Sequence, residues 1–99
     1  MPWYGASKAG MNAMGQSMAQ ALSTRNVFVF TVAPGFVQTP MAERILASPE
    51  GDQIRAQSPM GRVAQPDELG NIIRYLALEA PEFMTGCIVD LNGASYLRS

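Results

Sequence analysis

Apolar side chains recur every three or four positions in two stretches of the chain, and each stretch predicts an amphipathic helix. In the first, from about Tyr4 to Thr24, the stripe consists of Met11, Met14, Met18, Ala21 and Leu22. In the second, which begins near Pro66, it consists of Leu69, Ile72, Ile73, Leu76, Ala77 and Ala80. Proline suits the first helical position, and acidic residues directly after it complement the positive end of the helix dipole.

Two further stretches predict strands, and the first of them is rich in branched and aromatic residues without polar alternation. The first, Asn26 to Ala33, is typical of a strand buried on both faces of a parallel sheet, and Pro34-Gly35 ends it. The second, Gly86 to Leu91, predicts a short strand that is followed by a turn at Asn92-Gly93. A helix, a strand, a less regular segment, a helix and a strand together predict an α/β fold with one parallel crossover unit.

The segment between the first strand and the second helix is less regular. Met41 to Ala47 predicts a short helix, and Ser48 to Asp52 predicts a turn. So much irregular chain within a compact unit is typical of a lid or a binding loop.

The first helix also contains the internal glycines Gly10 and Gly15, and each costs about 1 kcal/mol relative to alanine. Either the helix is slightly weak, or another element approaches its backbone closely. We favour the close approach.

Composition excludes several classes of function. The chain has 99 residues, of which 47% are apolar and 15% charged, with a net charge of −1, so we expect a globular protein that binds no nucleic acid. It has no histidine, which excludes Ser-His triads, histidine-ligated zinc and a histidine base, and we predict no metal site. The single Cys87 excludes an internal disulfide. The apolar run Val27 to Ala33 is far shorter than the ~20 residues of a membrane span, and no secretory signal occurs, so we expect a cytoplasmic protein with no membrane partner.

Two positions in the first helix could carry acid–base chemistry. Tyr4 and Lys8 are four residues apart and therefore share a helix face. A phenol has a pKa of about 10, and a nearby ammonium and the helix N-terminus would both lower it. A tyrosine so tuned could give or take a proton at a carbinol or carbonyl oxygen. Such pairs also occur often on solvated helix faces, so the pair alone leaves both interpretations open.

The loop from Pro34 to Thr39 follows the first predicted strand. In an open parallel sheet, ligands bind beyond the carboxyl ends of the strands. The backbone N–H groups of this loop and the Thr39 hydroxyl could hold an amide or a phosphate, whereas the simpler interpretation is an ordinary turn.

Four segments in this order resemble the classical short-chain dehydrogenases/reductases, a subgroup that includes 3-oxoacyl-carrier-protein reductases. They are the Tyr-x-x-x-Lys stretch Tyr4 to Lys8, the loop from Pro34 to Thr39, the stretch Gly61 to Glu68, and the final strand Thr85 to Asp90. The resemblance covers essentially the whole chain. It implies that residues 1–99 are the C-terminal part of a Rossmann-like doubly wound parallel sheet, with 40–60 as the substrate lid.

The resemblance also implies a function, namely NAD(P)-dependent hydride transfer between nicotinamide and a small alcohol or carbonyl substrate. Tyr4 would be the acid/base, and Lys8 would lower its pKa and bind the nicotinamide ribose. Pro34, Gly35 and Val37 would line the nicotinamide pocket, with the Val37 backbone on the carboxamide. Thr39 would contact the carboxamide or a nearby phosphate.

Three features of the family's pattern differ here. The glycine-rich phosphate turn and the residue that selects NAD or NADP do not occur in the 99 residues, so we expect the isolated chain to be inactive. A non-enzymatic truncated remnant or assembly module of the same family is the alternative. Asn92-Gly93-Ala94 also stands where Asp-Gly-Gly is usual, a change expected to alter only a turn.

Two strands and two long helices cannot cover both faces of a parallel sheet, and Val27 to Ala33 would present an unpaired apolar edge. We therefore predict a homo-oligomer, formed through that edge and the small-residue face of the first helix, or a complex with a complementary N-terminal half. Light scattering of the purified chain should give a mass well above 10.7 kDa. A compact, soluble monomer of that mass would contradict the prediction.

Overall fold

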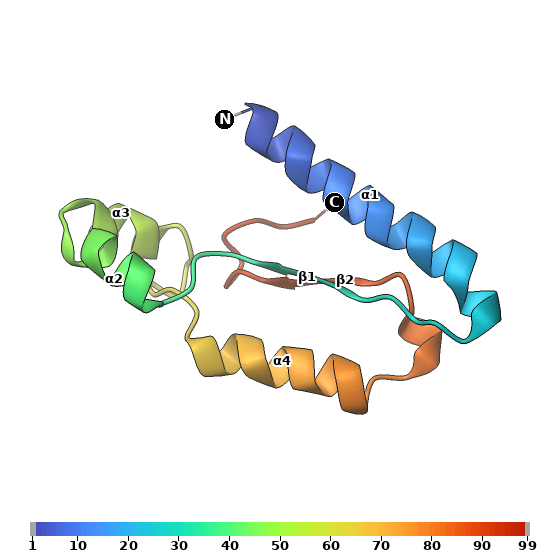
Figure 1. Ribbon diagram of the computed structural model, residues 1–99. Coiled ribbons are helices and arrows are strands. Elements are labelled where there is room, and N and C mark those ends of the chain that lie inside the picture. The colour runs from blue at the N-terminus through green and yellow to red at the C-terminus, as the bar shows by residue number, and fades with distance from the viewer. Residues whose placement is uncertain (1, 99) are drawn as a thin grey trace.

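The computed structural model describes the backbone of residues 2–98 and the side chains of residues 11–98. Its longer elements are α1 (Pro2–Leu22), β1 (Thr31–Pro34), α2 (Pro40–Ala47), α3 (Glu50–Ala56), α4 (Pro66–Leu78) and β2 (Ile88–Leu91) (Figure 1). Two 3₁₀ turns, η1 (Ser23–Arg25) and η2 (Glu82–Met84), follow α1 and α4. The order confirms the α/β prediction, because a helix and a strand are followed by the segment with α2 and α3 and then by a further helix and strand.

The two strands pair in parallel, with Val32 opposite Val89. At the two ends of the ladder, Thr31 N–H donates to the Cys87 carbonyl at 3.1 Å and Gly35 N–H donates to the Leu91 carbonyl at 2.8 Å. The chain between the strands passes through α2, α3 and α4, as a parallel connection requires.

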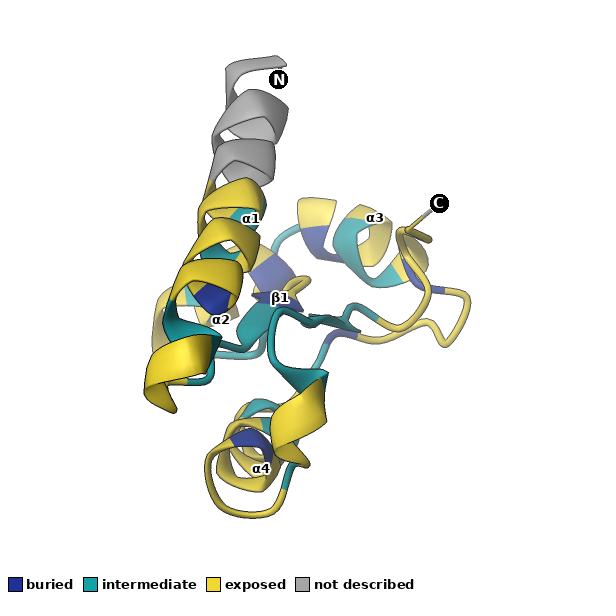
Figure 2. Cartoon of the chain, turned by 90° about the vertical axis from the view of Figure 1, so that its right-hand side faces the viewer, coloured by how far each residue is buried: buried dark blue, intermediate teal, exposed yellow. Residues whose placement is uncertain are grey.

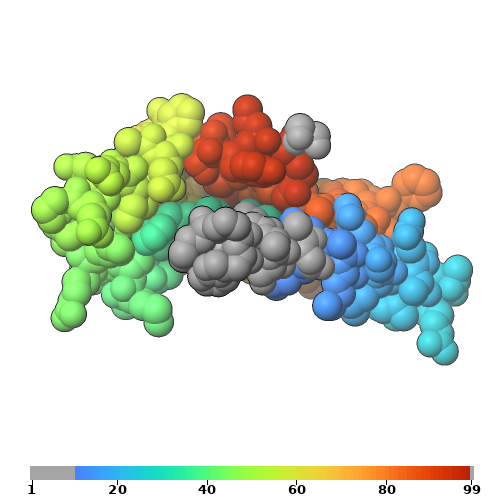
Figure 3. Space-filling view, turned by 90° about the horizontal axis from the view of Figure 1, so that it is seen from above, coloured from blue at the N-terminus to red at the C-terminus, as the bar shows by residue number. Residues whose placement is uncertain are grey.

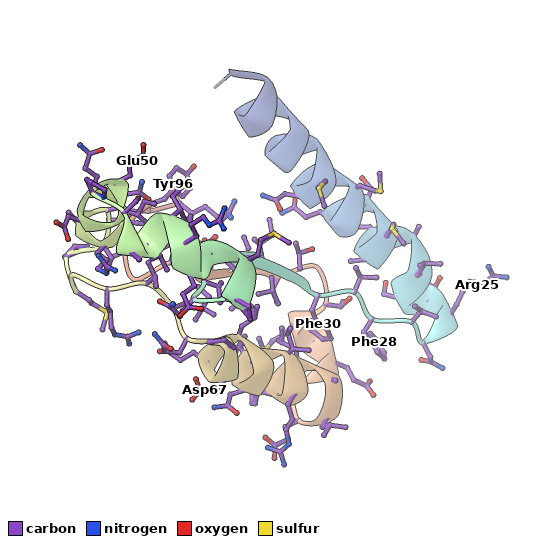
Figure 4. The ribbon with its side chains drawn as sticks, turned by 60° about the vertical axis from the view of Figure 1, so that its left-hand side comes forward. Arg25, Phe28, Phe30, Glu50, Asp67 and Tyr96 are labelled. Carbon is purple, nitrogen blue, oxygen red and sulfur yellow. The ribbon has the colours of Figure 1, made fainter. Side chains whose placement is uncertain are left out.

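Helices lie on both faces of this small sheet. A Cβ on Gly15 of α1 would lie 2.5 Å from the Thr31 Oγ1, so the close approach predicted for a glycine of the first helix is confirmed at Gly15. Thr31 therefore faces α1, and the side chains of Phe30 and Val32 alternate to the other face. That is the side on which α4 lies (Figures 1 and 4).

The core of the described residues is small. Its buried apolar side chains are Ala19, Ala33, Leu46, Val63 and Leu76, and no large side chain among residues 11–98 is fully buried (Figure 2). The radius of gyration is 15.4 Å, against about 13 Å for a compact chain of this length. Much apolar surface therefore stays open, including Met11 and Met14 on α1.

The prediction of a strand buried on both faces from Asn26 to Ala33 is wrong in its first half. Val27 is 45% exposed, and its N–H bonds back to the Leu22 carbonyl. Interstrand bonding begins only at Val29, whose carbonyl accepts from Gly86 N–H at 2.8 Å. The segment that leads into β2 comes alongside β1 only at this bond, so no β2 residue can pair with the part of the chain before Val29.

The predicted turn at Ser48 to Asp52 is also wrong beyond Pro49, because α3 begins at Glu50. Pro49 already has helical torsion angles, and Glu50 and Asp52 place negative charge in the first helical turn.

The predicted turn after β2 is confirmed. Ser95 N–H donates to the Asn92 carbonyl at 3.0 Å, and both residues between them have a positive φ, +58° at Gly93 and +64° at Ala94. A left-handed conformation costs an L-residue about 1 kcal/mol, so Ala94 carries strain that glycine would not.

We predict opposite effects for two helical Gly→Ala substitutions. Gly70→Ala on α4 should raise the free energy of unfolding by about 1 kcal/mol, because nothing lies within 4 Å of the new methyl group. Gly15→Ala should lower it by about 1 kcal/mol, because displacing Thr31 costs more than the helix gains. Urea titrations measure both values.

Adding Thr31→Ala to Gly15→Ala should recover most of the loss. Equal stabilisation by the two glycine substitutions would show that α1 does not rest on β1.

Candidate functional site

Tyr4 and Lys8 belong to α1, but their side chains lie outside the described residues. The helix puts both positions in its N-terminal half. Whether their side chains meet the loop after β1 therefore stays a prediction.

Pro34 is the last residue of β1, and Gly35 continues the ladder through its bond to Leu91. A Cβ on Gly35 would lie 3.0 Å from the Asn92 Cβ and 3.2 Å from its Cα. Packing against the end of β2 is therefore sufficient to explain glycine at this position. The loop still lies at the carboxyl end of the sheet, where parallel sheets bind ligands.

Val37 forms an isolated parallel bridge with Ala64. The bonds belong to its neighbours, since Gln38 N–H donates to the Ala64 carbonyl at 2.8 Å and Ala64 N–H donates to the Phe36 carbonyl at 3.0 Å. Alternate residues of a strand direct their backbone groups to opposite sides, so the Val37 N–H and carbonyl point away from Ala64. Neither group has a hydrogen-bond partner among the residues that the structure describes.

Thr39 is the N-cap of α2, and its Oγ1 accepts a hydrogen bond from Ala42 N–H at 3.1 Å. Pro40 at the first helical position supports this start. The cap uses the hydroxyl only as an acceptor, which leaves its proton for donation to a ligand. Thr39 and the free Val37 backbone groups thus belong to one short loop.

Helices α2 and α3 fill the predicted lid and pack tightly on each other. The Arg55 Nη2 donates to the Leu46 carbonyl at 2.6 Å, and a Cβ on Gly51 would lie only 2.0 Å from that oxygen. Seen from above, the pair forms a lobe at one end of the molecule, beside the C-terminal segment (Figure 3).

Sequence reasoning missed Ser58, which is 6% exposed and connects the end of this lobe to the turn after β2. Its Oγ donates to the Gly93 carbonyl at 2.6 Å and accepts from Met60 N–H at 3.1 Å. Only a serine before Pro59 marked the position in the sequence, and serine in such a stretch is typical of any turn.

Arg62 and Glu68 hold the chain between the lid and α4. The guanidinium donates to both carboxylate oxygens, at 2.8 and 3.1 Å, and Gln65 N–H donates to Glu68 Oε1 at 2.9 Å. These bonds lower the pKa of the Glu68 carboxyl to about 2, with the Arg62 hydrogen bond as the largest cause. The pair and the capping box fix where α4 begins.

A cavity of about 190 Å³ lies between the end of the lid and the end of β2. Phe36, Ile54, Met60 and Leu91 contribute apolar lining, and neither Val37 nor Thr39 takes part. The cavity nevertheless adjoins that loop, because Phe36 and Ala64, the bridge partner of Val37, line it.

The described part of the chain has neither a membrane-spanning helix nor a cluster of metal ligands. None of its helices is both long and apolar enough to cross a membrane. Its Cys, Asp and Glu side chains form no group of three that could hold a metal ion.

Burial raises the pKa of the Cys87 thiol.

Residues 1–93 match the family model described as enoyl-(acyl carrier protein) reductase. The 3-oxoacyl-[acyl-carrier-protein] reductase of Thermotoga maritima is 39% identical over 92 residues, which cover 91% of this chain and 36% of that protein. The enzyme of the same name from Aquifex aeolicus is 34% identical over 93 residues, which cover 94% and 37%. The chain thus spans somewhat over a third of the length of these relatives.

Solved structures share the fold. A Pseudomonas aeruginosa structure described as a RhlG/NADP active-site complex superposes with a TM-score of 0.85 at 30% identity. The match covers 95% of this chain and 38% of that one.

We predict that the Glu68 carboxyl titrates with a pKa of about 2, and that Arg62→Gln returns it toward 4.5. The folded-state pKa lies below the unfolded value, so the stabilisation from this pair is complete above about pH 4.5 and is lost as the pH falls through 2. NMR titration of the carboxyl carbon measures both values. Arg74→Gln on the same helix is the control and should leave Glu68 unchanged, whereas an equally low pKa in Arg62→Gln would contradict the assignment.

Proposed function

Since the chain belongs to the short-chain dehydrogenase/reductase family, we propose that it supplies the acid/base and nicotinamide-side part of an NAD(P)-dependent oxidoreductase. The reaction transfers a hydride between nicotinamide and a small alcohol or carbonyl substrate. The relatives above are named as reductases, which supports this reaction class.

One observation carries the proposal, namely the free backbone of Val37. A carboxamide both donates and accepts hydrogen bonds, and a backbone N–H and carbonyl on one residue can meet both needs. The bridge between Val37 and Ala64 holds these groups in place without using them. The Thr39 hydroxyl, two residues on, adds a donor to the carboxamide or to a phosphate.

The proposed acid/base is Tyr4, with Lys8 beside it. Lys8 favours the phenolate electrostatically and donates to the nicotinamide ribose. During carbonyl reduction, the Tyr4 hydroxyl gives its proton to the carbonyl oxygen of the substrate, and in the reverse direction the phenolate removes the alcohol proton. A bound NADH or NADPH supplies the hydride.

The loop and the Tyr4–Lys8 pair make only one side of a dinucleotide site. In doubly wound folds the pyrophosphate sits on a helix N-terminus after a glycine-rich turn, and the 99 residues contain no such turn. We therefore expect the cofactor to be held jointly with further chain, and either NAD or NADP fits the groups assigned above.

The ladder with β2 uses the backbone of Thr31 and Gly35, so the Val32 N–H and carbonyl point to the other edge of β1. We propose that a further strand pairs there, from a second copy or from a complementary N-terminal half.

In the full protein that contains this chain, Tyr4→Phe should lower kcat for carbonyl reduction by about 10²–10⁴-fold, the usual contribution of a general acid. The Kd for NADPH should stay unchanged, because the aromatic ring at position 4 and the Lys8 ammonium remain. Stopped-flow kinetics and fluorescence titration measure the two quantities.

Tyr75→Phe on α4 is the matched control and should leave both values unchanged. The 99-residue chain by itself should bind neither NADH nor NADPH. Tight binding by that chain, or full activity of Tyr4→Phe, would contradict the proposed site.

A further inference from the structure

The lid formed by α2 and α3 is bonded to the rest of the molecule at its N-terminal end, here called the front, and at its C-terminal end, here called the rear. At the front, Phe36 and Gln38 pair with Ala64, directly before α2 begins. At the rear, Ser58 follows α3 and bonds to Gly93. Between these points the two helices pack chiefly on each other.

We propose that Ser58 is a positioning residue, which fixes the rear end of the lid to the turn after β2 and thereby sets the position of the lid over the bound substrate. The role in substrate binding rests on the proposed function, whereas the anchoring of the lid does not.

The Ser58 hydroxyl both donates and accepts a hydrogen bond within the protein. It donates to the Gly93 carbonyl at 2.6 Å and accepts from Met60 N–H at 3.1 Å, and the residue is 6% exposed. Because a buried hydroxyl that loses its partner is costly, this pair of bonds favours one arrangement of the lid end.

The turn after β2 leaves room for the Ser58 side chain. A Cβ on Gly93 would lie 2.5 Å from the Ser58 Oγ, so a larger residue there would displace the hydroxyl, and the φ of +58° also favours glycine. Asn92 Nδ2 donates to the Tyr96 carbonyl at 3.1 Å and closes the chain over the turn. Two bonds from Arg98 to Asp90, at 2.8 and 2.7 Å, then hold the following segment on β2. The rear anchor is therefore the end of the sheet itself.

Side-chain packing does not hold the end of α3 in place of the bond from Ser58 to Gly93. The cavity of about 190 Å³ borders Ser58 and is lined by Ile54 and Gln57 on the lid side and by Leu91 on the sheet side. Without the bond, the rear end of α3 has open space into which it can move. Figures 3 and 4 both show the C-terminal segment beside the α2–α3 lobe, with Glu50 and Tyr96 labelled in Figure 4.

Loss of the anchor should affect substrate and cofactor differently. The substrate would have to order a looser lid on binding, so its KM should rise about five- to tenfold, as expected for one buried hydrogen bond. The Kd for NADPH should not change, because the segment with Val37 and Thr39 is held by backbone bonds to Ala64, and these bonds do not involve Ser58.

The test compares Ser58→Thr with Ser58→Val in the full protein, because these side chains have the same shape and differ in the hydroxyl. Hydrogen exchange read by mass spectrometry reports on peptides from residues 40–57 and from α4. The control is Ser48→Ala, which removes a hydroxyl that bonds only within the lid, to the Ile45 carbonyl. Steady-state kinetics give KM and kcat for the same variants.

Faster exchange in 40–57 but not in α4, found in Ser58→Val and absent in Ser58→Thr and Ser48→Ala, would support the anchor. Equal exchange in the Thr and Val variants would overturn it, and so would faster exchange throughout the chain, which marks a general packing residue. Faster lid exchange with unchanged KM would overturn the role in substrate binding. Since exchange needs no activity, a protein that transfers no hydride would refute the proposed function and leave the anchor testable.

Discussion

The parallel pairing of β1 with β2 is the interaction on which the rest of the structure depends. It joins two segments that are far apart in the sequence, and all of the lid and α4 lie between them. Because side chains alternate along a strand, this register also directs Thr31 toward Gly15 of α1 and its neighbours toward α4. The layers on the two faces therefore follow from one ladder.

The ladder also explains how the backbone of the loop beyond β1, the proposed cofactor site, is held in place. Gly35 still bonds to Leu91, whereas Phe36 and Gln38 bond to Ala64, so the chain changes partner within three residues. Backbone groups at such a change of partner are held in place but need not form hydrogen bonds, and those of Val37 form none within the part of the chain that the structure describes. The same region lies next to the cap of α2 at Thr39, so the site and the front of the lid share their support.

The sequence allowed the element order, the close approach at Gly15 and the turn at Asn92-Gly93 to be predicted, because periodicity and glycine placement are local properties. It did not allow the start of β1 to be placed, since this depends on where β2 arrives. It also missed α3 and the bond from Ser58 to Gly93, which joins residues 35 positions apart. Tyr4 and Lys8 rest on the family resemblance alone, and long-range contacts of this kind are what sequence patterns do not contain.

The most direct test of this account is amide hydrogen exchange at two adjacent residues, read by NMR on the full protein. Gln38 N–H should be protected with and without nucleotide, because it bonds to Ala64. Val37 N–H should exchange rapidly in the free protein and become protected only when NADH or NADPH is bound. Protection of Val37 without nucleotide, or rapid exchange at Val37 in the saturated complex, would contradict the claim that its backbone holds the nicotinamide.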